Sequence, residues 1–170
     1  MNSESIVLIG MAGVGKSTIG RSLSKALGFT FIDLDEYILE KDGKKIQEII
    51  DDGGEQALIQ LEEKRMYEID LHRKVVAPGG SIIYSSDLME YLKQRSTLVY
   101  LDDSFENVAS RLTNASARGI VGLKNKSLRQ IYLERSQLYP EYAGITVNCR
   151  GKSGDQIVDE ILHCLLDLKK

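Results

Sequence analysis

The segment GMAGVGKST at residues 10–18 constrains the fold of this chain more than any other part of the sequence. It fits the pattern G-x-x-x-x-G-K-[ST], which forms a phosphate-binding loop when a strand precedes it and a helix follows it. Residues 6–9 are an unbroken apolar run typical of a buried strand, and apolar residues recur at helical spacing from Ile19 to Leu27. The sequence therefore predicts a nucleotide phosphate site at this turn.

The residue types in this loop fit that chemistry. Glycines let backbone N–H groups surround a phosphate at the positive end of the helix dipole. The lysine adds a positive charge for the terminal phosphates, and the serine hydroxyl can ligate Mg²⁺. We expect Mg²⁺ to bind at Ser17 and the nucleotide to bind at Gly13, Val14, Gly15, Lys16, Ser17 and Thr18.

Length, charge and cysteine content restrict the class of protein further. The chain has 170 residues and a net charge of −3, which favours one domain over residues 1–170 and no nucleic-acid partner. No apolar run approaches the length of a membrane span, about 18 residues, and the start of the chain lacks signal-peptide features. The spacing of Cys149 and Cys164 does not fit a metal site, and Cys164 lies on the apolar stripe of a predicted helix. We expect a cytoplasmic protein with no membrane partner and with Cys164 in its core.

Strands and helices alternate along the rest of the chain. Further strands are predicted by apolar runs at residues 29–32, 75–77, 97–101 and 145–147. Helical patterns lie between these runs. This alternation predicts a three-layer α/β fold, with a parallel sheet covered by helices on both faces.

Three helix boundaries are predicted from local signals. Gly53-Gly54 interrupts a polar stretch, and the helix that follows is expected to run to about Leu71, with His72 capping or solvated at its end. A capping box at Ser127 begins a later helix, which is expected to end before Pro140.

Two carboxylates, Asp33 and Asp35, follow the second predicted strand. In extended backbone alternate side chains share a face, so both would point the same way and Leu34 the other. The carboxyl ends of parallel strands converge at one edge of the sheet, which would place both carboxylates beside the phosphate loop. Aspartate is also favoured in turns and helix caps, and the two interpretations are compatible.

Two segments without periodicity could complete a binding site. The turn Pro78-Gly79-Gly80-Ser81 either lets backbone amides approach a ligand or is simply a tight turn. Residues 114–126 contain small residues and few large apolar anchors, which is typical of a mobile loop and suggests a lid over the nucleotide. Arg118 in this loop either reaches the transferring phosphate or is solvated.

Two classes of phosphate-loop protein compete: a GTPase-type switch and a small-molecule kinase. A switch would normally carry Asp-x-x-Gly after its third strand, where this chain has Ala77-Pro78-Gly79-Gly80. The guanine-reading pattern Asn-Lys-x-Asp has only a near match at residues 125–128, which lacks the aspartate. The sequence favours the kinase.

The chain resembles the shikimate kinase family at Asp33-x-Asp35, Gly54-Glu55, residues 75–80 and Arg135-x-x-x-Tyr139. The resemblance runs nearly end to end. It implies a P-loop kinase fold with five parallel strands in the order 2-3-1-4-5, a mobile lid at about residues 114–126 and an acceptor-binding region at about residues 33–72. It also implies ATP and Mg²⁺ as cofactors, a small-molecule acceptor and a monomer.

The resemblance further implies roles for single residues. Asp33 would help to hold Mg²⁺, and Asp35 would bind the acceptor hydroxyl and accept its proton. Lys16 and Arg118 would stabilise the transferred phosphate. Adenine would lie between Arg111 and Arg150. The acceptor would bind at Asp35, at the position of Ile59, and at Gly79, Gly80, Ser81 and Arg135.

Three departures from the family pattern concern the acceptor and the lid. The family has a Phe-Arg pair whose arginine binds the shikimate carboxylate, where this chain has Leu58-Ile59. The third turn glycine is Ser81, and the lid sequence Arg-Pro-Leu-Leu reads Arg-Gly-Ile-Val at residues 118–121, which keeps the arginine. An isoleucine cannot bind a carboxylate, and losing such a charge-assisted pair costs about 2–5 kcal/mol.

Three interpretations follow from these departures. The first is an ATP phosphotransferase of this family acting on another small hydroxylated metabolite, such as homoserine or a sugar acid. The second is shikimate kinase with a rearranged carboxylate site. The third is a nucleotide-binding regulator that has lost catalysis. Survival of Lys16, Ser17, Asp33, Asp35 and Arg118 favours the two enzymes over the regulator.

Overall fold

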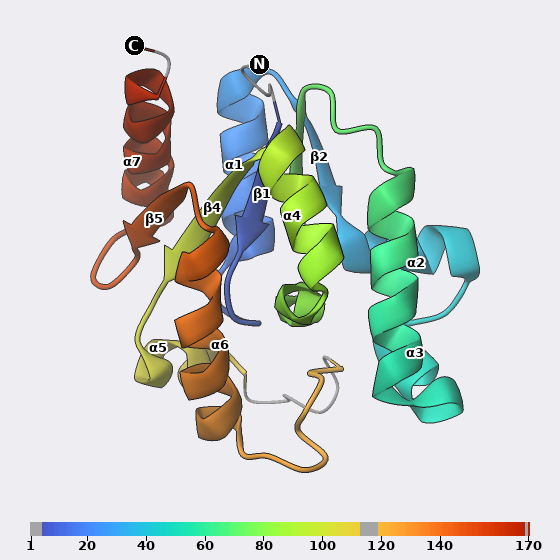
Figure 1. Ribbon diagram of the computed structural model, residues 1–170. Coiled ribbons are helices and arrows are strands. Elements are labelled where there is room, and N and C mark those ends of the chain that lie inside the picture. Colours follow the sequence, from blue (N-terminus) through green and yellow to red (C-terminus); the bar gives the residue numbers. More distant parts are fainter. Residues whose placement is uncertain (1–4, 113–118, 169) are drawn as a thin grey trace.

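A computed structural model describes residues 5–112, 119–168 and 170 of the chain (Figure 1). Its centre is a five-stranded parallel sheet with the order β2-β3-β1-β4-β5. The strands are β1 (Ile6–Ile9), β2 (Thr30–Asp33), β3 (Lys74–Ala77), β4 (Thr97–Asp102) and β5 (Ile145–Asn148). This sheet confirms the predicted fold class and strand order.

Helices pack on both faces of the sheet and bury its central strands. Every residue of β1 is buried, because β1 lies between β3 and β4 and under helices on each side. One side carries α1 (Lys16–Leu27) and α7 (Gly154–Asp167), which contact each other; α4 (Ser86–Arg95) and α6 (Leu128–Tyr142) pack together near β4 (Figure 1). The remaining elements are α2 (Leu34–Asp42), α3 (Ile46–Glu68), the 3-10 helix η1 (Gly80–Tyr84) and α5 (Phe105–Arg111).

The end of β2 differs from the extended backbone predicted there. The strand stops at Asp33, and α2 begins at Leu34, whose side chain is fully buried. Asp33 is the N-cap: its Oδ1 accepts hydrogen bonds from the backbone N–H groups of Asp35 (3.0 Å) and Glu36 (3.4 Å). The cap interpretation is confirmed. The alternating faces expected beyond Asp33 were wrong, because capping places Asp35 in the first turn of the helix.

The other predicted boundaries need smaller corrections. Gly54 adopts φ 81° and ψ 175° and kinks α3, with helix on both sides of it. This helix ends at Glu68, before the predicted end at about Leu71, and His72 lies beyond it and is exposed. Pro140 lies inside α6. Its missing N–H costs one hydrogen bond in the final turn, and the helix continues to Tyr142. Cys164 is half-buried and lies at the edge of the core.

No helix among the described residues is both long and apolar enough to cross a membrane.

Candidate active site

One cavity of about 770 Å³ lies at the carboxyl ends of the strands and is lined by most of the segments expected at the site. Its wall includes the phosphate loop, the start of α2, part of α3, the turn after β3 and residues from α5 and α6. In an open parallel sheet, ligands bind at this edge, where the chain leaves one strand and enters the next helix.

The phosphate loop has the backbone shape that its glycines predict. Gly10, Gly13 and Gly15 have φ values of 145°, 81° and 107°, a region that residues with side chains rarely adopt. The Lys16 side chain turns back into the loop, where its Nζ donates to the carbonyl oxygens of Gly10 (2.7 Å) and Met11 (2.8 Å). The ammonium group is thereby held at the centre of the loop.

Burial lowers the pKa of Lys16 to about 8, against the opposing effect of the carboxylates of Asp35 and Asp33. The cavity is lined by the predicted nucleotide-binding residues Gly13, Gly15, Lys16, Ser17 and Thr18. Val14 is buried beneath the loop, and its backbone N–H donates to the Met11 carbonyl oxygen. These residues form a cradle with one buried cation.

The two predicted Mg²⁺ ligands are in direct contact. The Ser17 hydroxyl donates a hydrogen bond to Oδ2 of Asp33, and both side chains line the cavity. Mg²⁺ prefers oxygen ligands, commonly one or two from the protein with water and phosphate oxygens for the rest. A hydroxyl and a carboxylate beside a phosphate loop fit that ion.

Another part of the cavity lining is formed by residues we call the acceptor wall: Glu62, Gly79, Gly80, Ser81 and Arg135. Arg135 is only 1% exposed, and its Nη2 donates to the Val121 carbonyl oxygen at 2.7 Å. A Cβ atom on Gly80 would lie 2.8 Å from Nη1 of Arg135, so the glycine turn and this guanidinium fit closely. The predicted Gly79, Gly80, Ser81 and Arg135 are therefore brought together with Asp35 in one cavity.

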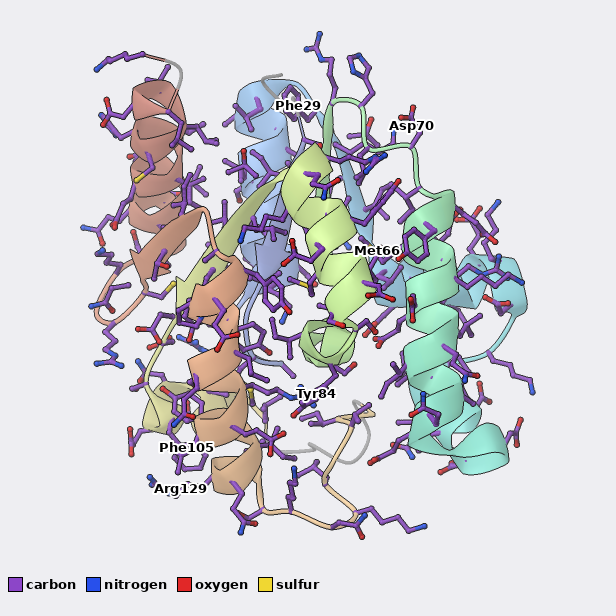
Figure 2. The ribbon with its side chains drawn as sticks, in the orientation of Figure 1. Phe29, Met66, Asp70, Tyr84, Phe105 and Arg129 are labelled. Carbon is purple, nitrogen blue, oxygen red and sulfur yellow. The ribbon has the colours of Figure 1, made fainter. Side chains whose placement is uncertain are left out.

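Aromatic side chains pack against Arg135 and the glycine turn. Tyr84, labelled in Figure 2, has its ring centroid 5.3 Å from Cζ of Arg135. The hydroxyl of Tyr139 donates to the carbonyl oxygen of Gly80 at 2.8 Å, which ties α6 to the glycine turn. Arg135 is thus a rigid, buried cation on the acceptor wall.

Glu62 is a buried carboxyl group in the wall that the sequence analysis missed. Its residue is 3% exposed, and its Oε2 accepts a hydrogen bond from the Ser81 hydroxyl at 2.7 Å. Burial raises its pKa to about 7; Asp35 also raises the pKa, while the Ser81 hydrogen bond, Arg135 and Lys16 lower it. The missed signal was a charged residue four positions after Leu58, on the buried face of a helix.

Ile59 was expected at the acceptor-binding position of α3. It is half-buried and packs against the hydrophobic core, and it is absent from the described residues that line the cavity. Arg118, the other cation expected near the phosphates, lies outside the described residues, as do residues 114–117 of the predicted lid.

Two arginines expected at adenine each have an acidic partner at the end of β4. Nη1 of Arg111 donates to Oδ2 of Asp103 at 2.9 Å and to the Gly13 carbonyl oxygen at 3.5 Å, so it reaches the phosphate loop. Arg150 lies 3.9 Å from Asp102 and is absent from the residues that line the cavity in the described part of the chain.

Figure 2 shows Phe105 at the start of α5, where the Arg129 guanidinium of α6 lies 4.2 Å from its ring centroid.

The described part of the predicted lid packs between α3 and α6. Ile120 and Val121 are buried and are among the few apolar anchors of this segment. The backbone N–H of Gly122 donates to Oε1 of Glu55 at 2.7 Å. Because Gly119, Ile120 and Val121 also line the cavity, this segment forms part of its wall.

Comparison with known proteins agrees with this geometry. A sequence model described as shikimate kinase matches residues 12–166. The shikimate kinase of Persephonella marina is 38% identical over 94% of this chain and 97% of its own, and that of Staphylococcus haemolyticus is 37% identical over 94% and 93%.

Among solved structures, shikimate kinase from Acinetobacter baumannii in complex with shikimate is 32% identical, with a TM-score of 0.89 over 96% of this chain and 93% of that one. A gluconokinase from Sinorhizobium meliloti, 20% identical with a TM-score of 0.53 over 96% and 92%, shares the fold. The chain is a small-molecule kinase and belongs to the shikimate kinase family.

Proposed function

We propose that this protein binds Mg·ATP at the phosphate loop and transfers the γ-phosphate to a hydroxyl group of a small acid bound against the acceptor wall. The observation that carries the proposal is one cavity that is lined by Lys16, Ser17, Asp35 and Arg135 together. Phosphoryl transfer depends mainly on positioning and charge neutralisation, which such a cavity can supply.

The roles of the chain's own residues follow from their chemistry. The backbone N–H groups of the loop and Lys16 bind phosphate oxygens, and Ser17 with Asp33 holds Mg²⁺. Asp35 binds the acceptor hydroxyl and accepts its proton. Arg111 and Arg150 flank adenine, and Arg118 stabilises the transferred phosphate. When bound, Mg·ATP supplies the phosphoryl group and the metal charge.

Shikimate is the first acceptor that we propose. The relatives named above support shikimate over the different acceptor that the sequence favoured. Arg135 supplies a buried guanidinium for the acceptor's carboxylate. Ile59 is absent from the described residues that line the cavity and contributes no cation to it.

A second candidate acceptor is a hydroxy amino acid such as homoserine. It is favoured by Glu62, whose carboxyl group lines the same wall as Arg135. A carboxylate on Arg135 and an ammonium group on Glu62 would match both charges of a zwitterion.

The remaining proposals concern organisation. Residues 1–170 form one kinase domain, with an acceptor-binding region at about residues 33–72 and a lid at about residues 114–126 that closes over the nucleotide. The protein acts as a monomer in the cytoplasm. Gel filtration coupled to light scattering tests the monomer.

The deciding experiment is coupled ADP release with Mg·ATP and a panel of shikimate, homoserine and gluconate. We expect turnover with shikimate, which Asp35→Asn abolishes while ATP binding is retained. Turnover of homoserine with none of shikimate would establish the second acceptor. ATP binding without turnover of any acceptor would contradict the proposed enzyme and support the regulator.

A further inference from the structure

Glu62 needs a hydrogen-bond partner because its carboxyl group is buried. The residue is 3% exposed on α3, and burying a charged carboxylate without a donor or a cation is costly. The Ser81 hydroxyl supplies a donor at 2.7 Å, and Ser81 is itself 5% exposed. The pair therefore joins α3 to η1 inside the acceptor wall.

Two departures from the family pattern meet at this carboxyl group. Residue 59 precedes Glu62 by three positions on α3, and residues three apart on a helix are neighbours. An arginine at position 59 would therefore reach Glu62, whereas Ile59 has no donor. Ser81 stands where the family pattern has a glycine, and a glycine has no side-chain donor.

We propose that Ser81 is a positioning residue for the acceptor, and that its hydroxyl replaces an arginine at position 59 as the partner that fixes Glu62 in the acceptor wall. The effect of Ser81 on acceptor binding rests on the proposed function. The contact between Ser81 and Glu62 stands independently of it.

The replacement changes the charge of the wall. A guanidinium partner would cancel the charge of Glu62, but a hydroxyl orients the carboxylate and adds no charge. Arg135 then faces an acceptor anion with Glu62 beside it. This wall favours an acceptor that offers a hydrogen-bond donor to Glu62 as well as an anionic group to Arg135. Hydroxyl-rich and zwitterionic acids meet that requirement, whereas a simple carboxylic acid does not.

The test measures the titration of the Glu62 carboxyl group by NMR in protein labelled with ¹³C-glutamate. Four proteins form a cycle: the native chain, Ser81→Ala, Ile59→Arg and the double variant. Ser81→Thr is the matched control, because it keeps the hydroxyl. The charged and polar groups facing Glu62 are Lys16 of α1, Asp35 of α2, and Arg135 and Tyr139 of α6, and they are the same in all proteins.

We expect Ser81→Ala to raise the pKa of Glu62 by about one unit, the effect of losing a hydrogen bond to a charged group. In the Ile59→Arg background, Ser81→Ala should raise the pKa of Glu62 by less than about half a unit, because the guanidinium already stabilises the carboxylate. Ser81→Thr should leave it unchanged. Equal shifts in both backgrounds, or no shift in either, would overturn the proposal.

A second measurement separates positioning from a structural role. Calorimetry with shikimate should show that Ser81→Ala changes the acceptor dissociation constant by about threefold or more, while that of Mg·ATP stays within about twofold. Equal changes for both ligands would contradict a role in acceptor binding. Because the NMR titration needs no acceptor, a protein that binds no shikimate would refute the proposed acceptor and leave the partner of Glu62 still measurable.

Discussion

Replacing Glu62 by glutamine should change how the stability of the protein depends on pH. The pKa of this carboxyl group is about 7 in the folded protein, against an ordinary value of 4.5. Between these values the folded chain holds a proton that the unfolded chain has released. The free energy of unfolding of the native protein therefore falls as pH rises through this window, and it levels off above the folded pKa.

The size of this effect follows from the two pKa values. A difference from 4.5 to about 7, at about 1.4 kcal/mol per unit, gives a loss of about 3 kcal/mol across the window. Glutamine has the same shape and its side-chain oxygen can accept from Ser81, but it does not titrate. Glu62→Gln should therefore gain about 3 kcal/mol over the native protein between about pH 4.5 and pH 7.

Urea unfolding at a series of pH values measures this difference directly. The lowered pKa of Lys16, about 8, makes stability rise with pH only above that value, so measurements up to about pH 7.5 avoid its contribution. A difference between Glu62→Gln and the native protein that stays constant over the series would refute the reasoning. It would mean that Glu62 titrates normally and that the wall admits water.

Three further predictions test other parts of the molecule. Asp35→Asn should lower kcat by about 10²–10⁴-fold in the ADP-release assay with Mg·ATP affinity unchanged, and equal loss of both would mean that Asp35 is structural. Gly20→Ala should destabilise the protein by about 1–3 kcal/mol in urea unfolding, because the methyl group would overlap the ring of Phe31; a stabilised variant would show that the ring moves freely. Asp103→Asn should raise the KM for ATP about threefold without changing the acceptor KM, because the half-exposed Arg111 loses its charged partner. A change in both KM values would mean that Asp103 supports the fold as a whole.

The parts of the fold that depend on neighbouring residues were predictable from the sequence. The glycine pattern at residues 10–18 specified the loop between β1 and α1, and the capping box at Ser127 marked the start of α6. Each of these signals depends on backbone dihedrals or hydrogen bonds within a few residues, so the local sequence suffices. Resemblance to a family supplied the strand order, which no local pattern contains.

The acceptor wall depended on contacts between distant segments. The buried face of α3 carries Leu58, Glu62 and Met66, whereas the neighbouring Leu61 and Arg65 are only half-buried. The kink at Gly54 and the packing of α3 against η1 set which face of the helix is buried. A shift of one position in a helix turns a side chain by about 100°, so a small change in packing decides whether a carboxyl group meets water or the cavity.

The sequence by itself therefore determined the phosphate loop, the alternation of strands and helices, and the residue types available for catalysis. The tertiary structure alone decided that Glu62 enters the cavity, that Ile59 packs against the core, and that Ser81 and Arg135 share one wall. The physical reason is distance along the chain. Burial and charge pairing between α3, η1 and α6 arise only when segments far apart in sequence are packed together.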